Sequence, residues 1–417
     1  MLIEFSVKNF MSIKDEITFS MIAGSGKENL ENVINSKNFN ESYLKTTAIY
    51  GANASGKTNF IRAFTAAIMM IRKSNARNVN EPLLEMQPFK FDLKKVNEPC
   101  EFKFVFMKND IKYIYGFSAD INKIYTEYLY QYLSSKPTMI FERKNVNEYK
   151  FKQSERSKLE ELSTKNTEKK LFLSTATEWN YEITKEPYMW FAENIDTFGD
   201  CLTMNNYVFS KFENDANGSL KKFTINLLKK SDILISDYNF EVKNINNIFN
   251  VNLSNDNFPK KEVKISTLHE IVNEDGQVNR YDLELSNESL GTQSLFFFSP
   301  ILKEAFENGK TIIVDEIDKS LHPLLVESII KLFHNPQINK SNAQLIFNTH
   351  DTNLLSLDIF RKDQIWFVEK EVKNAATDIY PLDDFSIRKT QNIQKGYLNG
   401  RYGAIPFISE ETSLWEN

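Results

Sequence analysis

The stretch Thr46–Asn59, with the sequence TTAIYGANASGKTN, decides which fold this chain can adopt. Its opening run TTAIY is typical of a buried strand, and Ile61, Phe64, Ile68 and Ile71 then recur at helical spacing. Strand, glycine-rich loop and helix therefore follow one another directly. This order is the context in which a phosphate-binding loop works.

The loop between this strand and helix matches the pattern G-x-x-x-x-G-K-[S/T]. Glycines let the backbone N–H groups wrap around phosphates, and the helix N-terminus adds partial positive charge. Lys57 supplies a point charge for the β and γ phosphates, and Thr58 offers its hydroxyl to Mg²⁺. We therefore predict that ATP and Mg²⁺ bind here. The expected phosphate contacts come from Gly51, Ala52, Asn53, Ala54, Ser55, Gly56, Lys57, Thr58 and Asn59.

Two carboxylates, Asp315 and Glu316, follow a second apolar strand, Thr311–Val314. We expect Asp315 to hold Mg²⁺, and Glu316, which points elsewhere, to polarise the attacking water. Paired acids also occur in ordinary loops. The phosphate loop upstream is what favours the catalytic interpretation.

Two further segments point to a nucleotide site only in combination with the phosphate loop and the acid pair. His350 ends the strand-like run QLIFNT, one strand beyond the acid pair, where a histidine can contact the γ-phosphate and the water. A lone histidine elsewhere is more often structural. The segment Asn287–Gln293, NESLGTQ, precedes a helix, and Ser-x-Gly at such a place is by itself only a capping signal.

The pattern along the chain divides it into three parts. Residues 1–142 hold the phosphate loop and an alternating Phe- and Tyr-rich region, residues 143–275 are rich in Lys, Asn and Glu with several helical segments, and residues 276–417 alternate strands and helices. We predict an α/β fold with a mostly parallel core sheet, an antiparallel β layer and a largely helical middle insertion. The first and third parts are expected to form one domain.

Two features have alternative interpretations. Phe102, Phe104 and Phe106 alternate along one strand, and a half-buried sheet face explains them more simply than stacking on adenine. The helix predicted over Ser219–Ser231 carries Lys222 and Lys229 away from its apolar side. A solvated basic face explains these more simply than a nucleic-acid contact.

Composition is that of an ordered globular protein. Among 417 residues, 41% are hydrophobic and 26% charged, and the net charge of −5 argues weakly against constitutive coating of DNA. Cys100 and Cys201 are far apart and suit a reducing compartment. The start of the chain does not resemble a signal peptide, and no apolar run reaches membrane-spanning length. We predict a cytoplasmic protein without a membrane contact.

Taken in order, the four motifs resemble those of the ATP-binding-cassette ATPases, in the soluble branch related to SMC, Rad50 and RecF proteins. By this resemblance GANASGKT is Walker A, IIVDE is Walker B with its catalytic glutamate, and His350 is the switch histidine. Ser289 and Gly291 then belong to a degenerate signature motif that acts on the γ-phosphate of an opposite subunit, although Leu290 and Thr292 depart from LSGGQ.

The resemblance implies weaker assignments for two other residues. His322 follows Ser320 and Leu321 where many family members carry the D-loop Asp. Gln87 follows the first helix, like the glutamine that senses Mg²⁺ in this family, but an ordinary polar residue in a loop explains it more simply.

The opening LIEFSVKNFMSIKDEITFSM, the run DEIDKSLHP and the segment YLNGRYGAIP resemble bacterial OLD-type ATPases of phage-defence operons, including the PARIS and Rlo types. OLD nucleases carry a C-terminal Toprim domain, and the chain ends too soon after its last predicted strand to hold one. The resemblance therefore implies a separate effector protein, most simply a nuclease, and DNA or a phage protein as trigger.

Three hypotheses result. In the first, the chain is an ATPase that pairs with itself through nucleotide and regulates this effector in antiviral defence. In the second, it is a DNA-binding repair clamp of the RecF or Rad50 kind, whose DNA affinity would depend on ATP and salt. In the third, ATP holds an oligomer together with little turnover, which Glu316 and His350 argue against.

Overall fold

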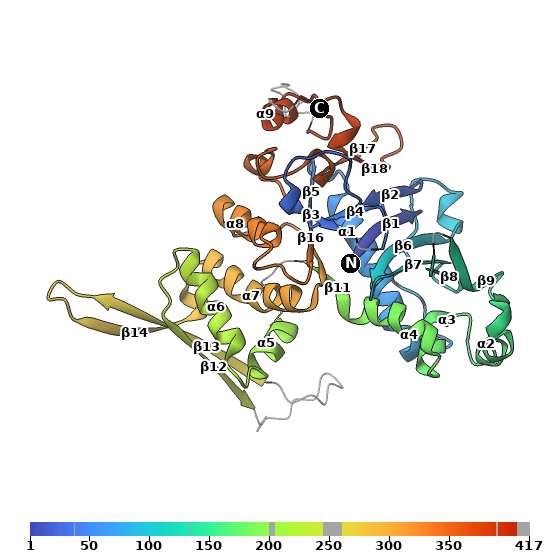
Figure 1. The fold of residues 1–417 in the computed structure, drawn as a ribbon, viewed down its shortest axis with the longest axis horizontal. Helices are drawn as coiled ribbons and strands as arrows, with labels where there is room; N and C mark the ends of the chain where they lie inside the picture. The colour runs from blue at the N-terminus through green and yellow to red at the C-terminus, as the bar shows by residue number, and fades with distance from the viewer. Residues whose placement is uncertain (37, 135, 200–204, 245–260, 389–390, 407–417) are drawn as a thin grey trace, which may run out of the picture.

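The computed structural model describes the chain except residues 37, 135, 200–204, 245–260, 389–390 and 407–417. Two sheets enclose the helix α1 (Lys57–Arg72), and further helices cover the far face of one of them (Figure 1). The fold is α/β with a parallel and an antiparallel layer, as the sequence predicted.

The core sheet places the predicted motifs on neighbouring strands. Within the described residues its order is β11 (Ile195–Phe198), β15 (Thr311–Val314), β16 (Gln344–Asn348), β5 (Thr46–Gly51), β17 (Ile365–Lys370) and β18 (Thr377–Pro381). All neighbours are parallel except β17 and β18. Because parallel strands end at the same edge, the phosphate loop, the acid pair and His350 meet there.

Alternate residues of this sheet serve two separate cores. Ile49, Ile313 and Ile346 face α1, whereas Ala48 and Tyr50 face the opposite cluster. That cluster is covered by α7 (Leu290–Asn308), α8 (Pro323–His334) and α9 (Ile393–Leu398). The apolar runs of the core strands are thus explained by burial on both faces.

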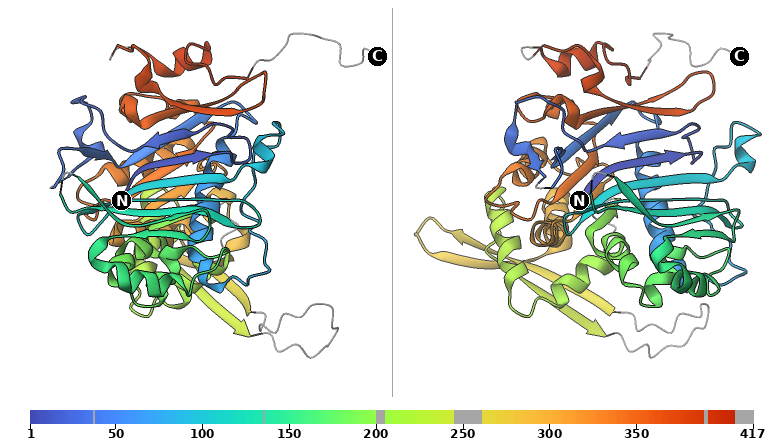
Figure 2. Two further views of the ribbon diagram at one scale, coloured as in Figure 1. Left: turned by 90° about the vertical axis from the view of Figure 1, so that its right-hand side faces the viewer. Right: turned by 45° about the vertical axis from the view of Figure 1, so that its right-hand side comes forward.

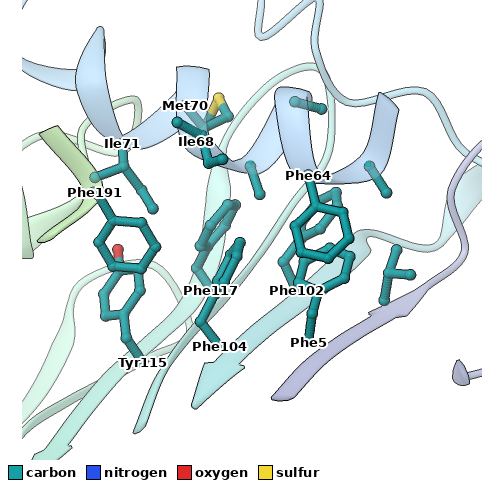
Figure 3. Packing of buried hydrophobic residues seen from close by; sticks show 14 of the residues in the cluster. Phe5, Phe64, Ile68, Met70, Ile71, Phe102, Phe104, Tyr115, Phe117 and Phe191 are labelled. Atoms are coloured by element: carbon teal, nitrogen blue, oxygen red, sulfur yellow. The ribbon is translucent and has the colours of Figure 1, made fainter. Parts of the chain in front are cut away.

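The antiparallel layer lies on the other side of α1. In the described part of the chain its order is β10 (Glu148–Phe151), β9 (Pro137–Lys144), β8 (Ile124–Tyr132), β7 (Ile111–Ala119), β6 (Cys100–Lys108), β1 (Leu2–Lys8) and β2 (Ile17–Ser20). Its aromatic face packs against α1, as Figure 3 shows, with the rings of Phe5 and Phe64 stacked 3.8 Å apart. Phe102, Phe104 and Phe106 are fully buried in this core, which confirms the sheet-face interpretation.

The glutamine Gln344 joins the two layers at the start of β16. Its Oε1 accepts from Leu2 N (2.6 Å) and from Thr311 Oγ1 (3.0 Å). Its Nε2 donates to the carbonyls of Leu2 and Leu44. One buried amide therefore fixes β1, β15 and the chain before β5 relative to one another.

The expectation for residues 143–275 needs a correction. This stretch does hold helices, but β11 lies within it and forms the edge of the core sheet, paired with β15 from Ile195↔Thr311 to Phe198↔Val314. A four-residue strand whose partner is distant in sequence leaves little periodicity to detect. The boundaries after 142 and after 275 stay a prediction.

The α- and π-helices that the structure describes between residues 143 and 275 are α2 (Arg156–Ser163), α3 (Phe172–Glu178), α4 (Glu182–Met189), a π-helix (Trp190–Asn194), α5 (Asn205–Glu213) and α6 (Ser219–Lys230).

The same stretch also contributes to a small third sheet, of order β12 (Asp237–Asn244), β13 (Lys261–Val272) and β14 (Val278–Glu284). The hairpin of β13 and β14 projects from the body of the molecule (Figures 1 and 2). Beside it, α6 buries Leu220 and Leu227 and exposes Lys222 and Lys229, so its basic face stays open to both interpretations.

Smaller features complete the comparison with the sequence. Between β2 and β5, the strand β3 (Val33–Asn35) pairs with β4 (Ser42–Leu44). Cys100 is buried, and burial raises the pKa of its thiol to about 12. Cys201 lies outside the described residues. No helix in the described part of the chain has the length and hydrophobicity needed to cross a bilayer.

His334 gives the fold a testable pH dependence. Its Nε2 lies 2.7 Å from Thr46 Oγ1, and burial, together with the nearby Lys45 cation, lowers its pKa from 6.5 to about 3. The unfolded chain therefore takes up a proton that the folded chain refuses, so stability is lost as pH falls below 6.5. We expect a loss on the order of 1 kcal/mol per pH unit between pH 6.5 and 5. His334→Gln should remove this slope in urea denaturation series, and equal slopes in both proteins would contradict the assignment.

Candidate functional site

The phosphate loop depends on its two glycines. Gly56 has φ 114°, and a Cβ there would lie 2.1 Å from Thr377 Oγ1. A Cβ on Gly51 would lie 2.4 Å from the Val368 carbonyl oxygen of β17. Both positions therefore exclude a side chain, whereas Ala54 adopts the left-handed region at φ 60° despite its methyl group.

Lys57 begins α1 and is only 5% exposed. Its Nζ donates to the carbonyls of Gly51 (2.8 Å) and Ala52 (3.1 Å), across the mouth of the loop. Burial lowers the pKa of this amine, while the carboxylates of Glu316 and Asp315 act in the opposite direction. Gly56 gives the helix no side-chain cap, so the first N–H groups of α1 keep their capacity to bind an anion.

The acid pair meets the loop through a shared amide. Thr58 Oγ1 donates to Asp315 Oδ1 (3.2 Å), and Asn348 Nδ2 donates to the same oxygen (2.5 Å). The amide oxygen of Asn348 accepts from the backbone N–H of Glu316. Asn348 thus holds both acids in place from the neighbouring strand β16.

Glu316 and His350 are both exposed at this edge of the sheet. Glu316 has φ 53°, in the left-handed region that residues other than glycine rarely adopt. The backbone N–H of His350 donates to Asp318 Oδ2 (3.2 Å), so the loop after β15 and the loop after β16 are joined. The arrangement can place a metal-binding acid, a base and a histidine around one phosphate chain.

The signature-like residues lie on a different element. Ser289 is the exposed N-cap of α7, and its Oγ accepts from Thr292 N (3.1 Å) and lies 2.9 Å from Thr292 Oγ1, where either hydroxyl can donate. A Cβ on Gly291 would lie 2.9 Å from the Ser320 carbonyl oxygen, so this glycine permits close packing against the D-loop-like segment. The capping role is confirmed, and the role toward a second subunit stays a prediction.

Two weaker assignments are also placed. The side chain of Gln87 is exposed, and its carbonyl accepts from Met11 N (2.7 Å), next to Ser12. A role in sensing Mg²⁺ stays a prediction. His322 is the N-cap of α8, and its Nδ1 accepts from Leu324 N. Its place in a D-loop stays a prediction.

The sequence interpretation missed two residues that support the loop, Ser12 and Thr377. Asn59 Nδ2 donates to Ser12 Oγ (2.9 Å), the Ser12 and Thr377 hydroxyls lie 2.8 Å apart, and Thr377 Oγ1 lies 2.8 Å from the Ser55 carbonyl. Thr377 Oγ1 carries one proton, for which the Ser12 hydroxyl and the Ser55 carbonyl are both acceptors within reach. These contacts link α1, the β1–β2 turn and β18 to the loop.

Comparison with known proteins now identifies the family. Residues 46–356, which are more than half of the chain, match the family described as "AAA domain, putative AbiEii toxin, Type IV TA system". The chain belongs to this AAA family. The match covers the phosphate loop, the signature-like segment, the acid pair and His350, so this AAA domain is a nucleotide-binding domain of the ATPase type.

Two solved structures are similar to this AAA domain at low scores. One is an SMC head bound to the C-winged helix domain of ScpA, with 12% identity and a TM-score of 0.37, covering 93% of this chain and 98% of that chain. The other is CbiO1 from Clostridium perfringens, part of the ABC transporter complex CbiONQ, with 12% identity, a TM-score of 0.33, and coverage of 88% and 86%. No curated protein matches the sequence significantly.

The hydroxyl chain through Thr377 yields a prediction. Thr377→Val keeps the shape but removes the donor to the Ser55 carbonyl, so we expect about fivefold weaker ATP binding, from the loss of one buried hydrogen bond. Thr377→Ser should bind like the wild type. Titration of a fluorescent ATP analogue measures both.

Thr126→Val, which breaks a hydroxyl pair with Ser118 on the antiparallel sheet, is the matched control. An equal effect of Thr126→Val and Thr377→Val on ATP affinity would show a general loss of stability instead.

Proposed function

We propose that this AAA domain hydrolyses ATP with Mg²⁺ at a site that is completed by a second copy of the chain. The observation that carries this proposal is the convergence of Thr58, Asp315 and Glu316, organised by Asn348, beside a preformed phosphate loop. A loop that only bound nucleotide would not need an exposed base fixed one residue beyond the metal-binding acid.

The oxygen donors fit Mg²⁺. Thr58 and Asp315 present a hydroxyl and a carboxylate 3.2 Å apart, which are the hard ligands that this ion prefers. The buried hydroxyl of Ser55 has no hydrogen-bond partner among the described residues, and it lies in the phosphate loop. When bound, Mg²⁺ would neutralise charge that develops on the phosphates.

Four side chains of this chain have separate roles in the proposed binding and hydrolysis of ATP. Lys57 would exchange its carbonyl partners Gly51 and Ala52 for phosphate oxygens. Glu316 would orient the attacking water and accept its proton, and His350 would contact the γ-phosphate. Gln87 would report on the metal from its place beside the β1–β2 turn.

The outward position of Ser289 supports the need for a second copy. Ser289 and Leu290 are both exposed at the start of α7, on an element separate from the phosphate loop of their own chain. In the proposed pair, Ser289 donates to the γ-phosphate held by the other chain, and Gly291 lets α7 approach closely enough. Hydrolysis then requires two chains, whereas binding requires one.

We further propose that this cycle controls a separate effector, a nuclease, in antiviral defence, with DNA or a phage protein as trigger. The resemblance of LIEFSVKNFMSIKDEITFSM and YLNGRYGAIP to defence-operon ATPases supports this role. The family description, which names a type IV toxin–antitoxin system, also supports action together with a partner protein.

The defence role predicts an effect of Lys57→Ala in cells. Bacteria that carry the gene with its neighbours should reduce the number of phage plaques, and Lys57→Ala should remove this protection. Unchanged protection would count against this role.

The catalytic assignment predicts a separation of binding from turnover. Glu316→Gln removes the base and should lower the ATP hydrolysis rate by about 10²–10³-fold while ATP still binds. Lys57→Ala should abolish binding. Phosphate release and nucleotide titration measure the two properties, and turnover unaffected by both changes would make the enzymatic proposal wrong.

Ser289 allows a test of the second copy. Ser289→Ala would also remove the helix cap, so Ser289→Asp is the sharper change because Asp caps helices as well as Ser. The added carboxylate should repel the γ-phosphate of the other chain, so we expect a loss of hydrolysis of more than about tenfold with unchanged nucleotide affinity of the single chain. Normal turnover of Ser289→Asp would exclude a trans role.

A further inference from the structure

The hairpin of β13 and β14 leaves a large surface uncovered. Every residue of β14 is exposed, and β14 is the edge strand of its sheet in the described part of the chain. Figure 1 shows the hairpin projecting at the left, away from the two sheets that enclose α1. Long exposed edge strands invite pairing with another chain, and proteins usually cover or shorten them. Its length and exposure therefore need an explanation.

The strand register sorts the hairpin into two unlike faces. His269 lies opposite Tyr281, Ile271 opposite Asn279, and Thr267 opposite Leu283. Residues directly opposite share a face, so Ile271, Tyr281 and Leu283 form one apolar stripe, and Tyr281 is 54% exposed. The other face carries the ion pair of Glu270 and Arg280 (3.1 Å) and, next to the turn, the exposed pair Val272 and Val278.

The apolar face is joined to the signature-like segment. Thr267 Oγ1 donates to Glu288 Oε1 (2.6 Å), and His269 Nε2 lies 2.7 Å from the same oxygen. Both side chains belong to the face that carries Tyr281, and Glu288 is the residue before Ser289. The stripe therefore continues outward from the place where the proposed function puts a second chain.

The segment 90–96, KFDLKKV, lies against the β1–β2 turn, and Ser12 of that turn contacts Asn59 at the start of α1. Phe91 and Leu93 are 72% and 88% exposed, and Lys90 and Lys94 flank them. The segment is fixed by Asn9, whose Nδ2 donates to the Lys95 carbonyl (2.8 Å), three residues before Ser12 of the loop support. At the hairpin turn, Glu274 and Asp275 are exposed and acidic.

We propose that in the ATP-bound pair the hairpin of each chain docks on segment 90–96 of the other chain. This inference rests on the proposed function, which pairs Ser289 of one chain with the phosphate loop of the other. In a two-fold symmetric pair, region A of one copy contacts region B of the other, and the same contact occurs a second time with the copies exchanged. The hairpin next to Ser289 of one chain therefore faces the segment next to the β1–β2 turn of the other chain. The apolar stripe of one chain then contacts Phe91 and Leu93 of the other chain. The acidic turn of the first chain contacts Lys90 and Lys94 of the other.

Charge reversal tests this contact. In the Glu316→Gln background with ATP and Mg²⁺, sedimentation velocity gives the dissociation constant of the pair. Glu274→Lys with Asp275→Lys should weaken pairing by about tenfold because like charges then face one another. Adding Lys90→Glu and Lys94→Glu should restore most of the affinity.

Substitutions on β14 supply a matched control. Tyr281→Ser should weaken the pair, whereas Val278→Ser, on the same strand but on the other face, should not. All these side chains are exposed, so no loss of folding is expected.

The outcomes separate the two proposals. A pair that forms with ATP and ignores every hairpin variant overturns the docking inference and leaves the proposed function standing. An absence of ATP-dependent pairing in the Glu316→Gln protein overturns the proposed function itself. Normal pairing with loss of binding to another protein or to DNA in Tyr281→Ser would assign the hairpin to that partner and overturn docking on a second copy.

Discussion

Strand β16 is fixed at both ends by an amide side chain, and the site depends on this constraint. Gln344 at its start joins β1, β15 and the chain before β5. Asn348 at its end joins Asp315 to the backbone of Glu316. Because the central strand cannot slide, the phosphate loop on one side and the acid pair on the other keep a fixed separation. Geometry of this kind is what phosphoryl transfer requires, since the protein contributes mainly positioning and charge.

The loop itself is held from the outside. Thr377 contacts Ser55 from β18, and Ser12 contacts Asn59 from the β1–β2 turn. Segments from early and late in the chain therefore converge on the phosphate loop and on the first turn of α1. Gly56 adopts its positive φ without steric cost because it has no Cβ, and the close approach of Thr377 leaves no room for one. A short motif in the sequence thus depends on contacts that are spread over most of the chain.

Sequence alone predicted the elements that carry periodicity and the motifs that carry chemistry. The loop, the acid pair and the strand before His350 stand where the patterns placed them, because a buried parallel strand must be apolar and must end where its ligand binds. The short strand β11 was not predicted, since four residues with a distant partner leave no period. Asn348 and Thr377 were not predicted either, because their importance lies in what they contact. Asn348 stands two residues before His350. A polar amide directly after the apolar run of a predicted strand was the one feature of the sequence that could have pointed to it. The catalytic and metal-sensing roles of Gln87, His350, Ser289 and Gly291 are proposals.

The hydroxyls of Ser289 and Thr292 lie 2.9 Å apart, and either one can be the donor. A lone pair of Ser289 serves Thr292 N at the same time. If a phosphate oxygen approaches, the Ser289 proton can turn toward it while the Thr292 proton turns toward Ser289. No heavy atom has to move and the helix cap survives. The approach of an anion to the first turn of α7 can therefore reverse the direction of the hydrogen bond between Ser289 and Thr292. This reversal needs almost no strain and no change in the backbone.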